Sequence, residues 1–161
     1  MQQRRSLGDD RPSDRASESS GAASSAFERL GGEARLRPII DTFVDRVVND
    51  VMIGFFFRSV DLERLKQFEY EFAAAHLGGP SNYSGRPLAR AHAQHPILGG
   101  HFNRRLRILE KTLADFSAPE DVIREWIEHN ERLRRVITRD LGTECILPTS
   151  PSSSAPSGEP R

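Results

Sequence analysis

Histidine is the residue type that most suggests chemistry in this chain of 161 residues. Four of its five histidines lie in one stretch, namely His76, His92, His95 and His101. Imidazole can ligate a metal or transfer a proton near neutral pH. A zinc site would need three or four ligands, and Pro96 disturbs the helical face that the His92-x-x-His95 spacing would require. We therefore do not expect zinc, and each histidine taken alone is most simply a surface or hydrogen-bonded core residue.

Glu69 interrupts an apolar pattern. It lies on the stripe formed by Leu62, Leu65 and Phe72, where helical spacing predicts an apolar side chain. Two interpretations remain open. Glu69 either marks the polar edge of a narrow stripe or faces a pocket, where an ionised carboxylate would be costly and the protonated form is favoured.

Three consecutive aromatic residues, Phe55, Phe56 and Phe57, form a second unusual feature. They cannot all face one core from a single helix or strand. A buried corner between two helices explains part of the pattern. A ring that stacks on a flat ligand would explain the rest.

The elements that must position these side chains are helices. Apolar residues recur at helical spacing in four segments, and no strand-like alternation of any length is present, so we predict an all-α domain. The segments are approximately 38–48, 59–77, 102–116 and 119–140, with a short helix over 88–94 between turn residues and Pro96. This helical coverage is thin and leaves space for a large apolar group.

Residue types at the helix ends predict where the helices begin. Pro38 suits a first helical turn, where its missing N–H costs nothing. Ser59 can cap the second segment. Ser117 can cap the last segment, with Pro119 at its first position and Glu120 at its third.

Composition limits the domain and its partners. The chain has 23 basic and 23 acidic side chains, so bulk charge gives no reason to expect nucleic-acid binding. No apolar run approaches the ~20 residues of a membrane helix, so we expect no membrane insertion. Cys145 is the single cysteine, which excludes an internal disulfide and favours a cytoplasmic location.

Two segments lack the apolar residues needed for a core. We predict disordered tails over 1–25 and 142–161 and a folded domain over 26–141. The arginines of the last two helical segments are interleaved with acidic residues, which is typical of an exposed face. Those arginines are Arg104, Arg105, Arg107, Arg124, Arg132, Arg134, Arg135 and Arg139.

An ordered set of short motifs resembles the truncated haemoglobins, most closely group I. The set runs through Phe27-Glu28-Arg29-Leu30-Gly31-Gly32, Asp41-x-Phe43-x-x-Arg46-Val47, Phe56-Phe57, Leu62-x-Arg64-Leu65-Lys66, Leu77-Gly78-Gly79-Pro80, Tyr83-x-Gly85-Arg86-Pro87-Leu88, Ala91-His92 and Ile97-x-x-x-His101-Phe102. No single motif is specific, but their order and spacing are. With the last two helices, the resemblance covers about 115 residues.

The resemblance implies a two-over-two helical sandwich around haem b. His92 matches the proximal ligand of the iron. Phe57 matches a ring that stacks on the haem, and Ile97 and Phe102 match apolar neighbours on the proximal side. Leu65 and Phe72 match residues of the distal wall. Arg64 and Lys66 match positions where a cation could pair with a haem propionate.

Two distal positions differ from the family pattern. Val44, directly after Phe43, stands where the family usually has tyrosine, and Glu69 stands where group I often has glutamine. Valine donates no hydrogen bond to bound O2, and glutamate donates only when protonated. Tyr70 is rotated ~100° around the helix from Glu69 and is expected to point away. CO and NO need less polar help and are expected to bind.

We therefore expect a protein that reversibly binds O2, NO or CO at pentacoordinate haem iron on His92, as a monomer or weak dimer. An NO dioxygenase-like or peroxidase-like side activity, with a reductase as partner, remains open. One alternative is a haem-based redox or sensing protein acting in the ferric state on peroxide, sulfide or NO. Another is a haem-free helical interaction domain.

Overall fold

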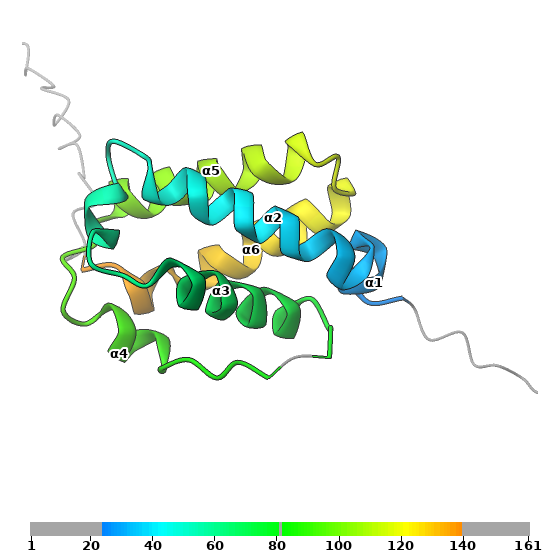
Figure 1. Ribbon diagram of the computed structural model, residues 1–161, viewed down its shortest axis with the longest axis horizontal. Coiled ribbons are helices and arrows are strands. Elements are labelled where there is room, and N and C mark those ends of the chain that lie inside the picture. Colours follow the sequence, from blue (N-terminus) through cyan, green and yellow to red (C-terminus); the bar gives the residue numbers. More distant parts are fainter. Residues whose placement is uncertain (1–23, 81, 140–161) are drawn as a thin grey trace, which may run out of the picture.

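The computed structural model describes residues 24–80 and 82–139, and within them the chain is helical without strands (Figure 1). The predicted all-α class is confirmed. Most of both predicted tails, and Cys145, lie outside the described residues. The elements are α1 (Ala26–Leu30), α2 (Gly32–Val48), the 3-10 helix η1 (Gly54–Phe57), α3 (Leu62–His76), α4 (Leu88–His92), α5 (Gly99–Asp115) and α6 (Glu120–Ile137).

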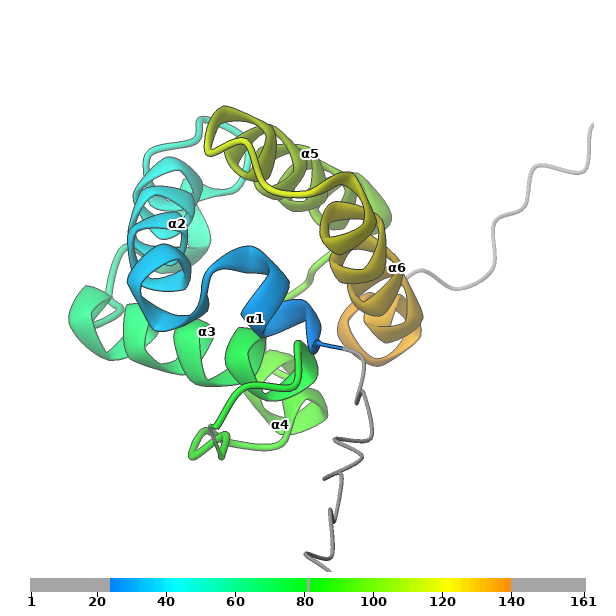
Figure 2. The same cartoon turned by 90° about the vertical axis from the view of Figure 1, so that its right-hand side faces the viewer.

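The four long helices form two packed pairs, α2 with α3 and α5 with α6, which meet where α2 contacts α5. Helix α2 packs against α3 and α5, and α5 packs against α6, as the end-on view in Figure 2 shows. Helix α1 contacts α2 and α6 at one end of the bundle. The short helix α4 packs against α6 and lies below α3 in Figure 1. No helix among the described residues is long and apolar enough to cross a membrane.

Helix α2 supplies much of the core. Its buried side chains recur every three or four residues, so they lie on one face of the helix. They are Leu36, Ile39, Ile40, Phe43, Val44 and Val47. This face packs with buried residues of α3 and α5, and each large apolar side chain removed from water contributes about 1.5–3 kcal/mol.

Three helices begin at positions other than those predicted. Helix α2 begins at Gly32, so Pro38 lies inside it; a proline removes its own N–H donor there, and the buried face holds the helix together. Asp61, not Ser59, caps α3, because it directly precedes the helix and its Oδ1 accepts from the Arg64 N–H at 3.2 Å. Pro119 is the N-cap of α6 rather than its first helical residue.

A capping box lies at the N-terminus of α1, the first helix. The Ser25 Oγ accepts from the Glu28 N–H at 3.2 Å, and a Glu28 carboxylate oxygen accepts from the Ser25 N–H at 3.0 Å. Gly31 ends α1 with a φ of 106°, a left-handed conformation that favours glycine. The chain can therefore turn directly from α1 into α2.

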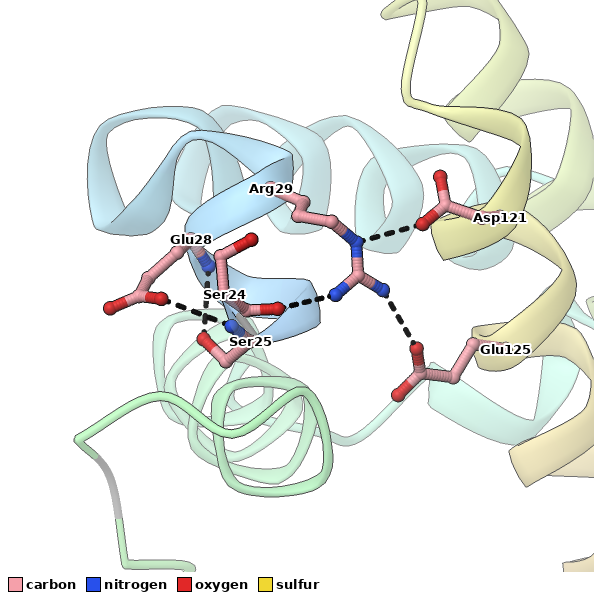
Figure 3. Close-up of polar contacts among 6 residues, drawn as sticks. All are labelled: Ser24, Ser25, Glu28, Arg29, Asp121 and Glu125. Atoms are coloured by element: carbon pink, nitrogen blue, oxygen red, sulfur yellow. Dashed lines mark hydrogen bonds and ion pairs between the residues drawn. The ribbon is translucent and has the colours of Figure 1, made fainter. Parts of the chain in front are cut away.

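Arg29 ties α1 to α6 (Figure 3). Its Nε donates to Asp121 at 2.7 Å and its Nη2 to Glu125 at 3.2 Å. Its Nη1 donates to the Ser24 carbonyl at 2.6 Å. One guanidinium thus joins the first helix to the first two turns of the last, and Asp121 in the first turn also suits the positive end of the helix dipole.

Candidate functional site

A cavity of about 250 Å³ lies among η1, α3, α4, α5 and α6. Most side chains in its wall are aliphatic or aromatic. Seven of the ten predicted site residues line it, although they come from five separate parts of the chain. These seven are Phe57, Leu65, Glu69, Phe72, His92, Ile97 and Phe102.

His92 is held in one orientation by its own helix. Its Nδ1 lies 2.8 Å from the carbonyl oxygen of Leu88, one turn earlier in α4. Nδ1–H donates in this contact, so the lone pair is on Nε2. Burial lowers the pKa of His92 below its usual value, so the imidazole is neutral at pH 7. A neutral, oriented imidazole in an apolar wall is suited to ligate a metal.

The Glu69 side chain also lines the cavity, in an ion pair with Arg105 of α5. Nη2 of Arg105 lies 2.8 Å from both carboxylate oxygens of Glu69. Nη1 donates to Asn130 Oδ1 at 3.2 Å, and the guanidinium carbon lies 4.9 Å from the centre of the Phe43 ring. Of the two interpretations of Glu69, the structure shows the pocket-facing one, with the charge paired.

Arg105 is the site residue that sequence reasoning missed. It was assigned to an exposed face, but its side chain is 25% exposed and lines the cavity. It stands three residues after Phe102 and four before Leu109, on the buried stripe of α5. The spacing that singled out Glu69 would therefore have found Arg105 as well.

The phenylalanine triplet is divided by the turn of η1. Phe56 and Phe57 line the cavity, whereas Phe55 is 47% exposed. The Phe56 ring centre lies 5.2 Å from that of His101 and 6.2 Å from that of His95, and both contacts are edge-on. Two further histidines therefore line the cavity beside an aromatic ring.

Val44 does not line the cavity. It is buried in the core, and its neighbour Phe43 is the residue whose ring meets the Arg105 guanidinium. Neither Phe43 nor Val44 is in the cavity wall. Consecutive helical residues are ~100° apart, so Val44 does not share the direction in which Phe43 meets Arg105.

Arg64 and Lys66 do not lie together at the mouth of the cavity. Lys66 Nζ pairs with Asp45 of α2 at 2.9 Å, at the outer side of the α2–α3 interface. The Arg64 guanidinium carbon lies 5.2 Å from the ring centre of Phe68, which does line the cavity. Residues two apart on a helix point ~200° apart, so the structure does not bring Lys66 to the side of α3 on which Arg64 meets Phe68.

A stacked pair of histidines lies behind the cavity wall. The rings of His76 and His129 are 4.1 Å apart and nearly parallel at 5°, and both contact Phe72. The Nε2 atom of each is buried without a hydrogen-bond partner among the described residues. Burial, and then the charge of His129, lowers the pKa of His76 to about 4.

A helical sandwich whose apolar cavity contains one oriented, neutral imidazole is the architecture of a small globin. The bacterial-like globin family matches residues 25–139, and the chain belongs to that family. It is 33% identical to the group 1 truncated haemoglobin of Mycolicibacterium paratuberculosis over 63% of this chain and 74% of that protein. It is also 33% identical to the Synechocystis group 1 truncated haemoglobin, over 63% of this chain and 86% of that one. The resemblance to group 1 truncated haemoglobins is thereby confirmed.

Solved structures agree on the fold. The Fe(III) form of truncated haemoglobin from Tetrahymena pyriformis superposes with a TM-score of 0.68 at 26% identity, covering 71% of this chain and 98% of that one. A Synechococcus two-over-two haemoglobin, crystallised with covalently attached haem, also gives 0.68, at 24% identity over 73% of this chain and all of that one. The predicted two-over-two sandwich is confirmed.

Proposed function

We propose that this chain is a haem protein in which His92 would hold the iron of haem b and Glu69 and Arg105 would line the part of the cavity that receives a small molecule. The observation that carries the proposal is the bond from Nδ1–H of His92 to the Leu88 carbonyl, at 2.8 Å, in the wall of an apolar cavity. When bound, haem iron supplies an open coordination position for O2, NO or CO.

The lining residues suit a flat apolar group with a polar edge. Phe57, Phe102 and Ile97 offer apolar contact area, and aromatic rings pack well on flat conjugated systems. Arg64 beside Phe68 is the cation that we assign to a carboxylate at the mouth. We do not assign Lys66 to that role, because it pairs with Asp45.

Ferric-state chemistry is a second candidate, and the Glu69–Arg105 pair favours it. Both carboxylate oxygens of Glu69 accept from Arg105, so an ionised Glu69 offers no donor to a bound O2. Peroxide or sulfide at ferric iron would not depend on the tyrosine and glutamine donors that the chain lacks. A peroxidase-like activity or a reductase partner belongs with this candidate.

Absorption spectroscopy of the full chain with added haemin tests the main proposal. We expect a protein-bound Soret band that shifts after dithionite and CO. His92→Ala should lose or weaken it, whereas His95→Ala, which removes another cavity histidine, should retain it. Free-haemin absorbance alone in the wild-type chain would refute haem binding and support the haem-free interaction domain. Equal spectra for the two variants would refute the role of His92 only.

We further propose a cytoplasmic location and a monomer or weak dimer. The single cysteine in the whole sequence supports the first, because extracellular proteins of this size commonly carry disulfides. Sedimentation at two protein concentrations tests the second: a stable dimer at low concentration would contradict it.

A further inference from the structure

Arg105 brings a permanent positive charge into a cavity whose wall is mostly apolar. Guanidinium remains protonated at all physiological pH values. The side chain is 25% exposed, so its field is screened less than that of a surface arginine. A charge in such a position interacts strongly with whatever shares the cavity.

Neighbouring residues fix the position of this guanidinium. Asn130 is 6% exposed, and its Nδ2 donates to the Trp126 carbonyl at 2.9 Å, which orients its Oδ1 toward Arg105. Glu69 holds the other side of the guanidinium through Nη2. A donor that is already oriented loses little entropy when a ligand binds.

The contacts of Arg105 leave some of its hydrogen-bonding capacity unused. Guanidinium has five N–H donors, and its hydrogen bonds involve only Nη1 and Nη2. Among residues 24–80 and 82–139, Nε–H of Arg105 has no hydrogen-bond partner. A further acceptor in the cavity can therefore be bound without first breaking the pair with Glu69.

Arg105 and Glu69 both act electrostatically on His92. The charge of Arg105 lowers the pKa of His92, and the charge of Glu69 raises it. The ion pair therefore faces the same cavity as the proposed axial ligand. A ligand in this cavity experiences the fields of both charges, and the N–H groups of Arg105 favour a ligand that accepts a hydrogen bond.

From this arrangement we infer that Arg105 is the ligand-selecting residue of the cavity: it would donate to a small monoanion bound at the iron that His92 holds, and so favour anions over neutral diatomic gases. Glu69 opposes this effect by competing for the same guanidinium. The inference rests on the proposed haem site, and it adds the ligand class and the residue that recognises it.

The test compares an anion with a neutral ligand in the haemin-loaded full chain. Azide is titrated into the ferric protein and CO into the ferrous protein. A hydrogen bond to a charged group is worth enough for us to expect azide affinity to fall about 10-fold or more in Arg105→Leu, with CO affinity changed less than about 3-fold. Arg105→Lys should retain part of the azide affinity, and Glu69→Gln should raise it.

Arg104→Leu is the matched control. Arg104 is the adjacent residue, but its Nη2 pairs with Asp50 at 2.7 Å, away from the cavity wall. Arg105→Leu leaves the partly buried Glu69 without its partner and can destabilise the fold. We therefore also compare the double variant Glu69→Gln/Arg105→Leu with Glu69→Gln, because neither leaves an unpaired carboxylate.

The C–O stretching frequency supplies a readout independent of affinity. A positive charge facing bound CO lowers this frequency, so the double variant should show a higher frequency than Glu69→Gln. Equal azide affinity and equal frequency in these two variants would overturn the inference while leaving haem binding intact. A wild-type chain that takes up no haemin would overturn the inference together with the proposed function.

Discussion

The stacked imidazoles of His76 and His129 should make the fold less stable as the pH falls from 7 to 5. The pKa of His76 is lowered from 6.5 to about 4, chiefly by burial. A base with a lowered pKa in the folded state binds its proton more readily when unfolded. Its contribution to stability is therefore complete above pH 6.5 and is lost as the pH falls toward 4.

The magnitude follows from this shift. One pKa unit corresponds to about 1.4 kcal/mol, so His76 alone should remove at most about 2 kcal/mol of unfolding free energy between pH 7 and pH 5. His129 and His92 add in the same direction, since burial lowers their pKa values also. Asp50 and Asp115, whose pKa values are lowered from 3.8, and Glu71, whose pKa is lowered from 4.5, lose their contributions below those ordinary values, outside this interval.

Urea denaturation at fixed haem loading, from pH 7 to pH 5, measures the effect. Wild-type stability should fall by about 2 kcal/mol or somewhat less, and in His76→Phe it should fall by less than half as much. His95→Phe, which changes a histidine outside the stacked pair, should follow the wild type. If the three proteins lost stability in parallel, the assignment of the pH dependence to the stacked pair would be wrong.

Three stability predictions concern the scaffold, each measured as a change in the free energy of unfolding. Leu36→Ala should cost about 2–5 kcal/mol because Leu36 is fully buried. A loss below about 1 kcal/mol would mean that neighbouring side chains fill the space that the leucine leaves. Asp61→Ala should cost about 1 kcal/mol by removing the cap of α3, whereas Asp61→Ser should be nearly neutral. Gly79→Ala should cost about 1–3 kcal/mol because its Cβ would lie 2.6 Å from the ring of Phe27; an unchanged stability would show that the ring moves freely.

Helical periodicity predicted the all-α class and the long helices well, because it depends on neighbours in the sequence, whereas the two-over-two arrangement was predicted from the family resemblance. The stripes of α2 and α5 and the position of His92 on a short helix are all set by spacings of a few residues. The helix starts were less certain, since Ser59 and Asp61 are both competent caps and only the packing of α3 decides between them.

The polar side of the cavity was harder to predict because its partners lie far apart in the chain. Glu69 and Arg105 are separated by 36 residues, and Arg105 stands between Arg104 and Arg107 in a run of arginines that is typical of an exposed face. Arg64 and Lys66 were paired by a family motif that takes no account of helical direction. On α3 the two side chains separate, with Arg64 beside Phe68 and Lys66 on Asp45.

The brevity of α4 has a kinetic consequence. This helix has five residues, contains no buried residue, and has its main packing partner in α6. Short elements with few buried side chains open at a lower free energy than the rest of a fold, so the amides of residues 88–92 should exchange with solvent faster than those of α5. The residue assigned to hold the iron thus lies on a segment that opens more readily than the long helices. We expect the cofactor to enter and leave when α4 opens, while the four long helices stay folded.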